Sequence, residues 1–168
     1  MSAGHACGVM SATRAASLLL FVVSAGLLLG ALGFQYLGGL APCEMCYWQR
    51  WGHVAVLAAA AVAFVGNRRP LGVLAVVVML VAAGLGAYHA GVELKWWQGV
   101  TACTAPVGGG LSTAEMMDAL LRAPLVRCDS IPWSLFGISM AGWNALISAG
   151  AALLALLLLK AKRIGKQA

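Results

Sequence analysis

The stretch APCEMCYWQRWGHVAVLAAAAVAFV, residues 41–65, places two cysteines and an arginine directly before a long apolar run. From Cys46 onward the stretch is long enough to cross a bilayer, which takes about 20 mostly apolar residues. Because lipid offers the backbone no hydrogen-bond partners, such a segment must be a helix. We therefore predict a membrane helix over about 46–65, with Cys43, Cys46 and Arg50 at its mouth.

The rest of the chain has the same apolar character. Of its 168 residues, 62% are hydrophobic and only 10% are charged, whereas a soluble domain carries about 25% charged residues. Three further stretches are long enough to span a bilayer, over about 15–34, 71–88 and 135–159. The first is longer than the core of a signal peptide, about 7–15 residues, so we expect it to be retained. The composition predicts an all-α integral membrane four-helix bundle that forms one domain over 1–168.

The charges are divided between the two sides of this bundle. Seven of the eleven basic residues flank the spans on one side: Arg14, Arg68, Arg69, Lys160, Lys162, Arg163 and Lys166. All five acidic residues lie in the loops on the other side, over about 35–45 and 89–134. The positive-inside rule then predicts that both termini are cytoplasmic. The net charge of +6 thus follows from topology and does not predict nucleic-acid binding.

The long outer loop carries a helix-start signal. Ser112 and Glu115 fit a capping box, and Leu111 and Met116 fit the accompanying hydrophobic staple. Pro124 would end the helix that they start. We expect this short amphipathic helix to lie along the membrane surface.

The cysteines define the chemistry of the loops. Four of the five fall on the outer side, where disulfides persist: Cys43, Cys46, Cys103 and Cys128. Three kinds of site remain open: two structural disulfides, a metal-thiolate site and a redox pair. A metal site usually repeats the close cysteine spacing, which occurs only once here, and haem attachment by CxxCH is excluded because Tyr47 follows the pair. A CxxC pair favours redox work, because its two sulfurs interconvert between dithiol and disulfide with little backbone movement.

Arg50 lies four residues after Cys46, on the same face of the predicted helix. Its charge, together with the partial positive charge of the helix N-terminus, would stabilise a Cys46 thiolate. An arginine at this depth is costly, so a function is the default interpretation, although its long side chain also allows it to snorkel to the surface. The same charge could hold a polar headgroup dissolved in the bilayer, and quinones are such molecules that accept two electrons.

With these residues in view, the chain resembles the DsbB family of disulfide-generating membrane proteins. The resemblance rests on four spans and on three motifs: PCEMCYWQR at 42–50, YHAGVELKWWQGVTACT at 88–104 and RCDSIPWSLFGISMAGWNAL at 127–146. It implies a protein of the bacterial inner membrane that reoxidises a periplasmic thioredoxin-fold protein similar to DsbA. The electrons would pass to ubiquinone or menaquinone in the membrane.

The resemblance also implies a role for each outer cysteine. Cys43 and Cys46 match the quinone-proximal pair, with Cys46 as the sulfur that engages the quinone and Arg50 as the residue that positions it. Cys103 matches the sulfur that the partner's thiolate attacks, and Cys128 matches its disulfide partner. An exchange between Cys128 and Cys43 is then expected as an intermediate.

Two histidines are further candidates for the quinone site. His53 follows Arg50 by three residues, so both share a face of the helix with Cys46, and a histidine can supply a proton for quinone reduction. The alternative for His53 is a structural role as a buried, hydrogen-bonded side chain. His89 closes the third predicted span, where it faces the quinone or caps the span at the interface.

Two other functions stay open. One is a four-span membrane protein with purely structural loop disulfides, which would not reduce a quinone. The other is a vitamin K epoxide reductase-like thiol oxidoreductase, in which the CxxC typically falls late in the chain, whereas here it opens the second span. We therefore favour a quinone-dependent protein thiol:disulfide oxidoreductase.

Overall fold

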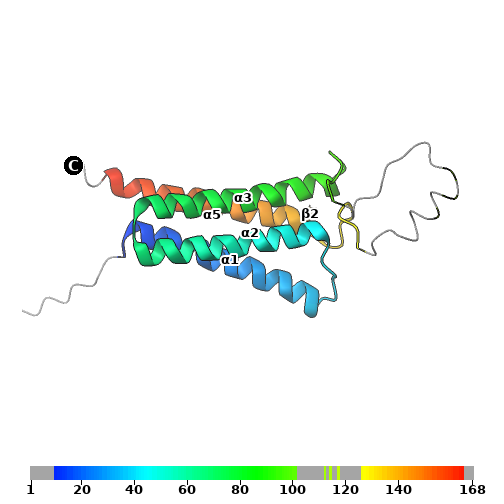
Figure 1. The fold of residues 1–168 in the computed structure, drawn as a ribbon, viewed down its shortest axis with the longest axis horizontal. Helices are drawn as coiled ribbons and strands as arrows, with labels where there is room; N and C mark the ends of the chain where they lie inside the picture. Colours follow the sequence, from blue (N-terminus) through cyan, green and yellow to red (C-terminus); the bar gives the residue numbers. More distant parts are fainter. Residues whose placement is uncertain (1–9, 102–111, 113, 115–116, 118–125, 165–168) are drawn as a thin grey trace, which may run out of the picture.

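The computed structural model describes residues 10–101, 112, 114, 117 and 126–164. Within these ranges it contains four long helices: α1 (Ala12–Tyr36), α2 (Glu44–Gly66), α3 (Arg69–Glu93) and α5 (Met140–Ile164) (Figure 1). Two short strands, β1 (Ser134–Leu135) and β2 (Ile138–Ser139), form the only sheet among the described residues. The predicted helical fold is confirmed apart from this hairpin. The predicted amphipathic helix of the long loop lies almost entirely outside the described residues, as does Cys103.

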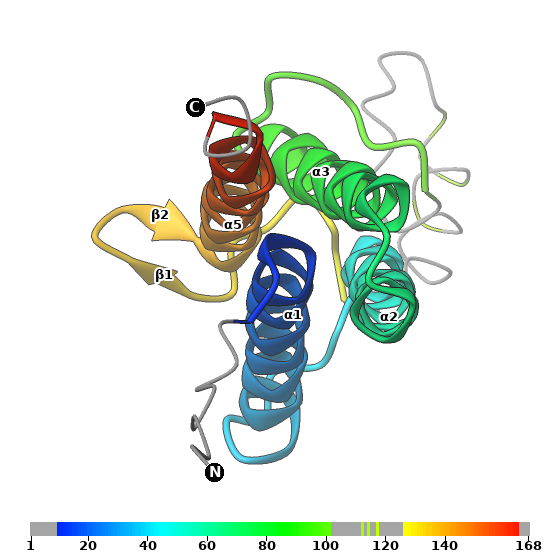
Figure 2. The same cartoon turned by 90° about the vertical axis from the view of Figure 1, so that its left-hand side faces the viewer.

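The four helices lie side by side, with α1 and α3 each packed against both α2 and α5 (Figure 2). A tight turn joins α2 to α3, where Asn67 adopts a left-handed conformation (φ 45°) and Pro70 occupies the first turn of α3. The Ser11 hydroxyl bonds to the Asn67 side chain, so the start of α1 lies beside this turn. The opposite end of the molecule holds the α1–α2 connection, the end of α3 and the hairpin (Figure 1).

In the part of the chain that the structure describes, three helices are long and apolar enough to cross a membrane: Ala12–Tyr36, Arg69–Glu93 and Met140–Ala161. The helix α2 is not among them, because Gln49, Arg50 and His53 lower the hydropathy of its first half. Large apolar side chains are exposed on the outer faces of the helices, including Val22, Leu29, Val62, Val77, Val81 and Leu153. These features fit a membrane protein, since lipid solvates an apolar outer surface.

Small side chains fill the interior between the helices. The core is rich in alanine: Ala16, Ala60, Ala63, Ala75, Ala82, Ala151, Ala152 and Ala155 are buried alongside Leu20, Val56, Val76, Met79 and Leu159. Such residues let helix backbones approach closely, which strengthens van der Waals packing where lipid provides no hydrophobic drive for association.

At Gly86, α3 lies close against the backbone of α5. A Cβ atom at this position would lie 3.0 Å from the backbone nitrogen of Ala145 and 3.2 Å from the carbonyl oxygen of Ala141. We expect Gly86→Ala to destabilise the protein by about 1–3 kcal/mol, the usual effect of overpacking, because a helix backbone cannot move aside like a side chain. Thermal unfolding in detergent measures this. The matched control is Gly84→Ala, since a Cβ on Gly84 meets nothing within 4 Å, and an equal loss of stability in both variants would contradict the packing argument.

The fourth predicted span was placed too early. It was expected to begin at Leu135, but α5 begins at Met140, and the preceding residues form the hairpin in which Leu135 pairs with Ile138. Positive φ angles at Phe136 (53°) and Gly137 (76°) close the hairpin, as two-residue turns that match strand twist require. The apolar composition of this segment resembles a helix, so hydropathy alone does not detect the turn.

Candidate active site

The cysteine pair lies at the start of α2. Cys43 is the N-cap residue: its sulfur accepts a hydrogen bond of 3.2 Å from the backbone nitrogen of Cys46. The two sulfurs are 2.8 Å apart and both cysteines are free thiols. A disulfide bond needs a sulfur–sulfur separation of about 2.05 Å, so oxidation of this pair to a disulfide requires only a small movement of the two sulfurs. The helix begins at Glu44 rather than at Cys46, so the sulfur nearest the free backbone groups of the helix N-terminus is that of Cys43.

The two thiols are not equivalent. The hydrogen bond with Cys46 and then burial raise the pKa of Cys43 well above its ordinary value, and the backbone N–H of Cys46 opposes this only in part. Cys43 is 5% exposed, whereas Cys46 is only partly buried. When the pair loses one proton, Cys43 therefore keeps its own and Cys46 carries the thiolate. That Cys46 is the more reactive sulfur in catalysis stays a prediction.

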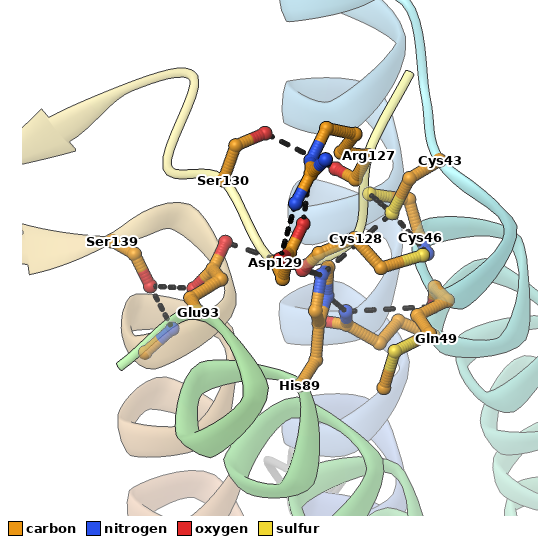
Figure 3. Close-up of polar contacts among 12 residues, drawn as sticks. Cys43, Cys46, Gln49, His89, Glu93, Arg127, Cys128, Asp129, Ser130 and Ser139 are labelled. Carbon is orange, nitrogen blue, oxygen red and sulfur yellow. Dashed lines mark hydrogen bonds and ion pairs between the residues drawn. The ribbon is translucent and has the colours of Figure 1, made fainter. Parts of the chain in front are cut away.

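Cys128 lies against this pair. It is fully buried and packs with Cys43, Met45 and Val92. Cys128 is disulfide-bonded, and its partner is neither Cys43 nor Cys46, because these two are free. His89 links the two regions: its Nε2 is 3.7 Å from the Cys43 sulfur and 3.1 Å from the Cys128 carbonyl oxygen. Figure 3 shows Cys128 and His89 converging on the cysteine pair.

A cluster of charges holds the segment that carries Cys128. The Asp129 carboxylate accepts bonds from Lys95 Nζ (2.6 Å) and from Arg127 Nε (2.9 Å) and Nη2 (2.7 Å). The Arg127 hydrogen bond and the charges of Lys95 and Arg127 lower the pKa of Asp129 to about 2. Lys95 lies two residues after the end of α3 at Glu93, so its ion pair with Asp129 ties the loop to that helix.

We expect the contribution of Asp129 to stability to depend on pH. An aspartate with a lowered folded-state pKa stabilises the protein above its unfolded pKa of about 3.9, and the stabilisation is lost as pH falls through about 2. Asp129→Asn should therefore lower the melting temperature at neutral pH. This difference from the wild type should shrink as the pH is lowered from about 4 toward 2. Thermal unfolding at several pH values tests this, and a difference that stays constant at low pH would contradict it.

A cavity of about 650 Å³ opens beside the cysteine pair, between α1, α2 and α5. Toward the end that carries the cysteines, α1 slopes away from the other helices (Figure 1). Most of the lining is apolar or aromatic, including Leu27, Leu28, Phe34, Trp133, Leu135, Phe136, Trp143 and Ile147. Four polar or reactive groups predicted from the sequence line the same cavity: Cys46, Arg50, His53 and His89.

Arg50 is half-buried at the cavity wall and reaches across to α1. Its guanidinium donates to Gln35 Oε1 (2.5 Å) and to the Ala31 carbonyl oxygen (3.2 Å), and it lies 5.4 Å from the centre of the Tyr47 ring. The side chain is thus tied to the neighbouring helix α1. Its charge stays close to the cavity and to Cys46.

Both predicted histidines are buried at the cavity, each 3% exposed. His53 bonds to Ser24 (3.2 Å) and Asn144 (2.7 Å). It is therefore the buried, hydrogen-bonded side chain of the structural alternative, and it also lines the cavity. His89 lies inside α3, because this helix continues to Glu93 and does not end at residue 88 as predicted. Glu93 therefore follows His89 by one turn, with its Oε1 4.0 Å from His89 Nε2.

Three further residues belong to this site, and the sequence analysis missed them. Gln49 bonds to His89 (2.6 Å), Asn144 bonds to Gln49 (2.6 Å), and Glu93 accepts a hydrogen bond from Ser139. A polar side chain inside an apolar helix is a signal of function. That signal was available for Asn144, which lies in the apolar helix α5.

The fold and the site define a membrane-type helical protein with a buried, redox-capable cysteine pair beside an apolar cavity. Comparison with known proteins agrees with this class. Residues 13–158 match the family model described as "Disulfide bond formation protein DsbB". The chain therefore belongs to the DsbB family, and membership identifies it as a thiol oxidoreductase of disulfide bond formation.

Three relatives illustrate the similarity, each named "Disulfide bond formation protein B". The protein from Aromatoleum aromaticum is 33% identical over 91% of this chain and 96% of its own length. The protein from Marinobacter nauticus is 32% identical over 76% of this chain and 80% of its own length. The protein from Xanthomonas oryzae pv. oryzae is 33% identical over 85% of this chain and 88% of its own length.

Proposed function

We propose that this protein oxidises a periplasmic DsbA-like dithiol protein and passes the two electrons to a membrane quinone. The single observation that carries the proposal is the position of the cysteine pair. Cys46 lines an apolar cavity at a membrane helix, while Cys43 packs against Cys128 of the outer loop. A thiol relay between a soluble protein and a lipid-soluble acceptor needs this arrangement.

The cavity fits a quinone by its chemistry. Its apolar walls suit an isoprenoid-type molecule, and the guanidinium of Arg50 could hold a carbonyl oxygen of the ring, with Cys46, His53 and His89 in the same lining. A volume of about 650 Å³ is within the usual range of ligand sites, about 300–1,000 Å³. The bound quinone, ubiquinone or menaquinone, supplies the capacity to accept two electrons and two protons.

The thiol chemistry follows as a series of exchanges. A thiolate of the partner attacks Cys103 of a Cys103–Cys128 disulfide, and Cys128 leaves as a thiolate. The partner's second thiol then displaces Cys103, so the partner leaves with a disulfide and this pair is reduced. Cys128 then attacks Cys43 of the Cys43–Cys46 disulfide, and Cys46 leaves as a thiolate. Cys103 attacks Cys128 in turn, which restores the loop disulfide and leaves Cys43 and Cys46 as thiols. Each exchange conserves one disulfide and moves two electrons.

The residues around the cysteine pair support the proposed transfer of electrons from this pair to the quinone. Cys46 carries the thiolate at the cavity, because Cys43 keeps its proton. Arg50 places a fixed positive charge at the cavity wall. His89 lies beside the Cys43 sulfur and is placed to donate a proton there.

The same proposal includes the topology. All four long helices cross the bacterial inner membrane, α2 included, as one four-helix bundle. The end with Arg14, Arg68, Arg69 and Lys160 faces the cytoplasm together with both termini. The end with the cysteine pair, Lys95 and Asp129 faces the periplasm, where the partner is found.

A turnover assay tests the proposed function. The purified full-length protein in detergent is mixed anaerobically with an excess of reduced DsbA-like protein and either ubiquinone-1 or a short-chain menaquinone, and quinone absorbance is followed. We expect consumption that requires both this protein and the dithiol partner. No consumption with either quinone, while the disulfide of Cys128 stays intact, would favour purely structural disulfides. In a parallel reaction with the thiol form of this protein and an oxidised partner, reduction of the partner without quinone would indicate a reductase.

A further inference from the structure

A continuous line of hydrogen bonds crosses the molecule beneath the cysteine pair. From α1 it runs through Ser24, His53, Asn144, Gln49 and His89 to the Cys128 carbonyl oxygen. The five distances are 3.2, 2.7, 2.6, 2.6 and 3.1 Å in that order. The line therefore joins α1, α2, α5, α3 and the outer loop through side chains that are buried or partly buried. Figure 3 shows its final section, from Gln49 through His89 to Cys128.

The direction of these bonds is fixed at the Cys128 end. A backbone carbonyl can only accept, so His89 Nε2 must donate to it. The NH₂ group of Gln49 also lies 3.5 Å from another carbonyl, that of Met45. It therefore presents a donor to His89 Nδ1, which must accept. His89 is thus neutral, with its proton on Nε2.

The orientation continues back along the line. Gln49 Oε1 accepts from the Asn144 NH₂ group, so Asn144 Oδ1 is left to face His53 Nε2, and it also accepts from Ser148 (3.3 Å). His53 therefore donates through Nε2 and accepts through Nδ1 from the Ser24 hydroxyl. The alternative acceptor for this hydroxyl is the Met79 sulfur at 3.9 Å, which is a weak one. All five hydrogen bonds point the same way.

We propose that Asn144 is a positioning residue that, acting through Gln49, fixes the proton of His89 on Nε2. In this tautomer the N–H faces the Cys43 sulfur at 3.7 Å as well as the Cys128 carbonyl. The Cys43 sulfur, one of the two that take part in the proposed exchange, then lies beside a hydrogen-bond donor. The catalytic meaning of this arrangement rests on the function proposed above, whereas the arrangement itself does not.

The other groups that face His89 do not fix its tautomer. Glu93 on α3 lies 4.0 Å from Nε2 and is engaged by Ser139. Cys43 and Cys46 approach from the start of α2, with the two sulfurs and the imidazole within 4.8 Å of one another. Glu93 and Cys43 approach His89 at Nε2, whereas Nδ1 is bonded to Gln49. The Cys128 carbonyl holds the proton on Nε2, and the amide pair is the element that keeps Nδ1 without one.

Histidine-selective ¹⁵N labelling of the full-length protein in detergent tests this, because long-range ¹H–¹⁵N spectra distinguish the two tautomers. We expect the Nε2–H form for both His53 and His89, assigned with a His53→Phe variant. Asn144→Asp replaces a donor by a group that only accepts. Gln49 must then turn its NH₂ group toward the new carboxylate and its oxygen toward His89, so a proton should appear on Nδ1 of His89. His53, which still donates to an oxygen, should keep its tautomer.

Two further variants make the test decisive. Gln49→Glu presents an acceptor directly to His89 Nδ1 and should cause the same shift, even if Asn144→Asp fails to fold. Asn67→Asp makes the same chemical change in the exposed α2–α3 turn and should leave both histidines unaltered. An Nδ1–H form of His89 in the wild type, or an unchanged His89 in the folded Asn144 and Gln49 variants, would overturn the proposal.

Activity provides a second, separate measurement. If the proposed function holds, Asn144→Asp should slow quinone reduction about ten-fold, as expected for the loss of one hydrogen bond worth about 1.4 kcal/mol, and Asn67→Asp should not. A wild type that shows the expected tautomers but never reduces quinone would reject the proposed function and leave this inference standing. A tautomer shift with full activity would show that the hydrogen-bond line exists but does not serve catalysis, and would overturn the role assigned to Asn144.

Discussion

Replacing Cys46 with serine is expected to reduce quinone turnover to the rate measured without the protein. Serine cannot form a disulfide, and its hydroxyl does not ionise near neutral pH, so neither the exchange nor the final electron transfer can proceed. Cys43 cannot substitute, because it is buried and a single thiol has no Cys46 sulfur with which to form the disulfide. The assay is quinone absorbance with a reduced DsbA-like protein as the electron source.

The same variant should trap an intermediate. Without Cys46 as its disulfide partner, Cys43 neighbours Cys128 in the buried cluster. A Cys43 thiolate can then attack Cys128 of the proposed Cys103–Cys128 disulfide, with Cys103 leaving as a thiolate. We expect a mixed disulfide between Cys43 and Cys128, detected by non-reducing peptide mapping. Cys7→Ser makes the same substitution in the predicted cytoplasmic tail and should retain full turnover. Normal turnover by Cys46→Ser would contradict the role of this sulfur.

Replacing Arg50 with methionine should raise the KM for the quinone about 10- to 100-fold. The loss of a hydrogen bond from a charged donor costs about 1.5–3 kcal/mol, and methionine keeps the length of the side chain without its charge. The guanidinium also bonds to Gln35 and Ala31, so part of the effect would come from a shift of α1. Arg50→Lys keeps the charge but not the two-pronged geometry, and it should have an intermediate KM.

Turnover measured over a range of quinone concentrations separates these effects. Arg68→Met removes an arginine from the opposite end of α2, at the turn that precedes α3, and should change neither KM nor kcat. An Arg50→Met variant with an unchanged KM would show that the arginine only joins two helices. A lower kcat at the same KM would place its effect on electron transfer instead of on binding.

Local sequence spacing was enough to predict one side of the site. Cys46, Arg50 and His53 are close in sequence on one helix, so helical periodicity alone places them along one wall, and all three line the cavity. The α2–α3 turn was predictable in the same way, because a short stretch with basic residues separates two apolar segments there. These predictions needed no knowledge of how the helices pack.

The contacts between helices could not be predicted in this way. Asn144 bonds to Gln49 across 95 positions of the chain, and nothing in either segment specifies that partner. His89 and Glu93 were assigned to the end of a span and to a loop, because the polar residues from Tyr88 onward resemble a helix end. The structure continues the helix through them and buries both.

The most direct test of the account is the stoichiometry of the reaction. Reduced DsbA-like protein and ubiquinone-1 are incubated anaerobically with a catalytic amount of the purified protein. Quinol is measured by absorbance and partner disulfide by alkylation of the remaining thiols. The account predicts one quinol formed for each partner disulfide. Partner oxidation without quinol, or quinol without partner oxidation, would contradict the claim that the cysteines pass electrons from the dithiol to the quinone.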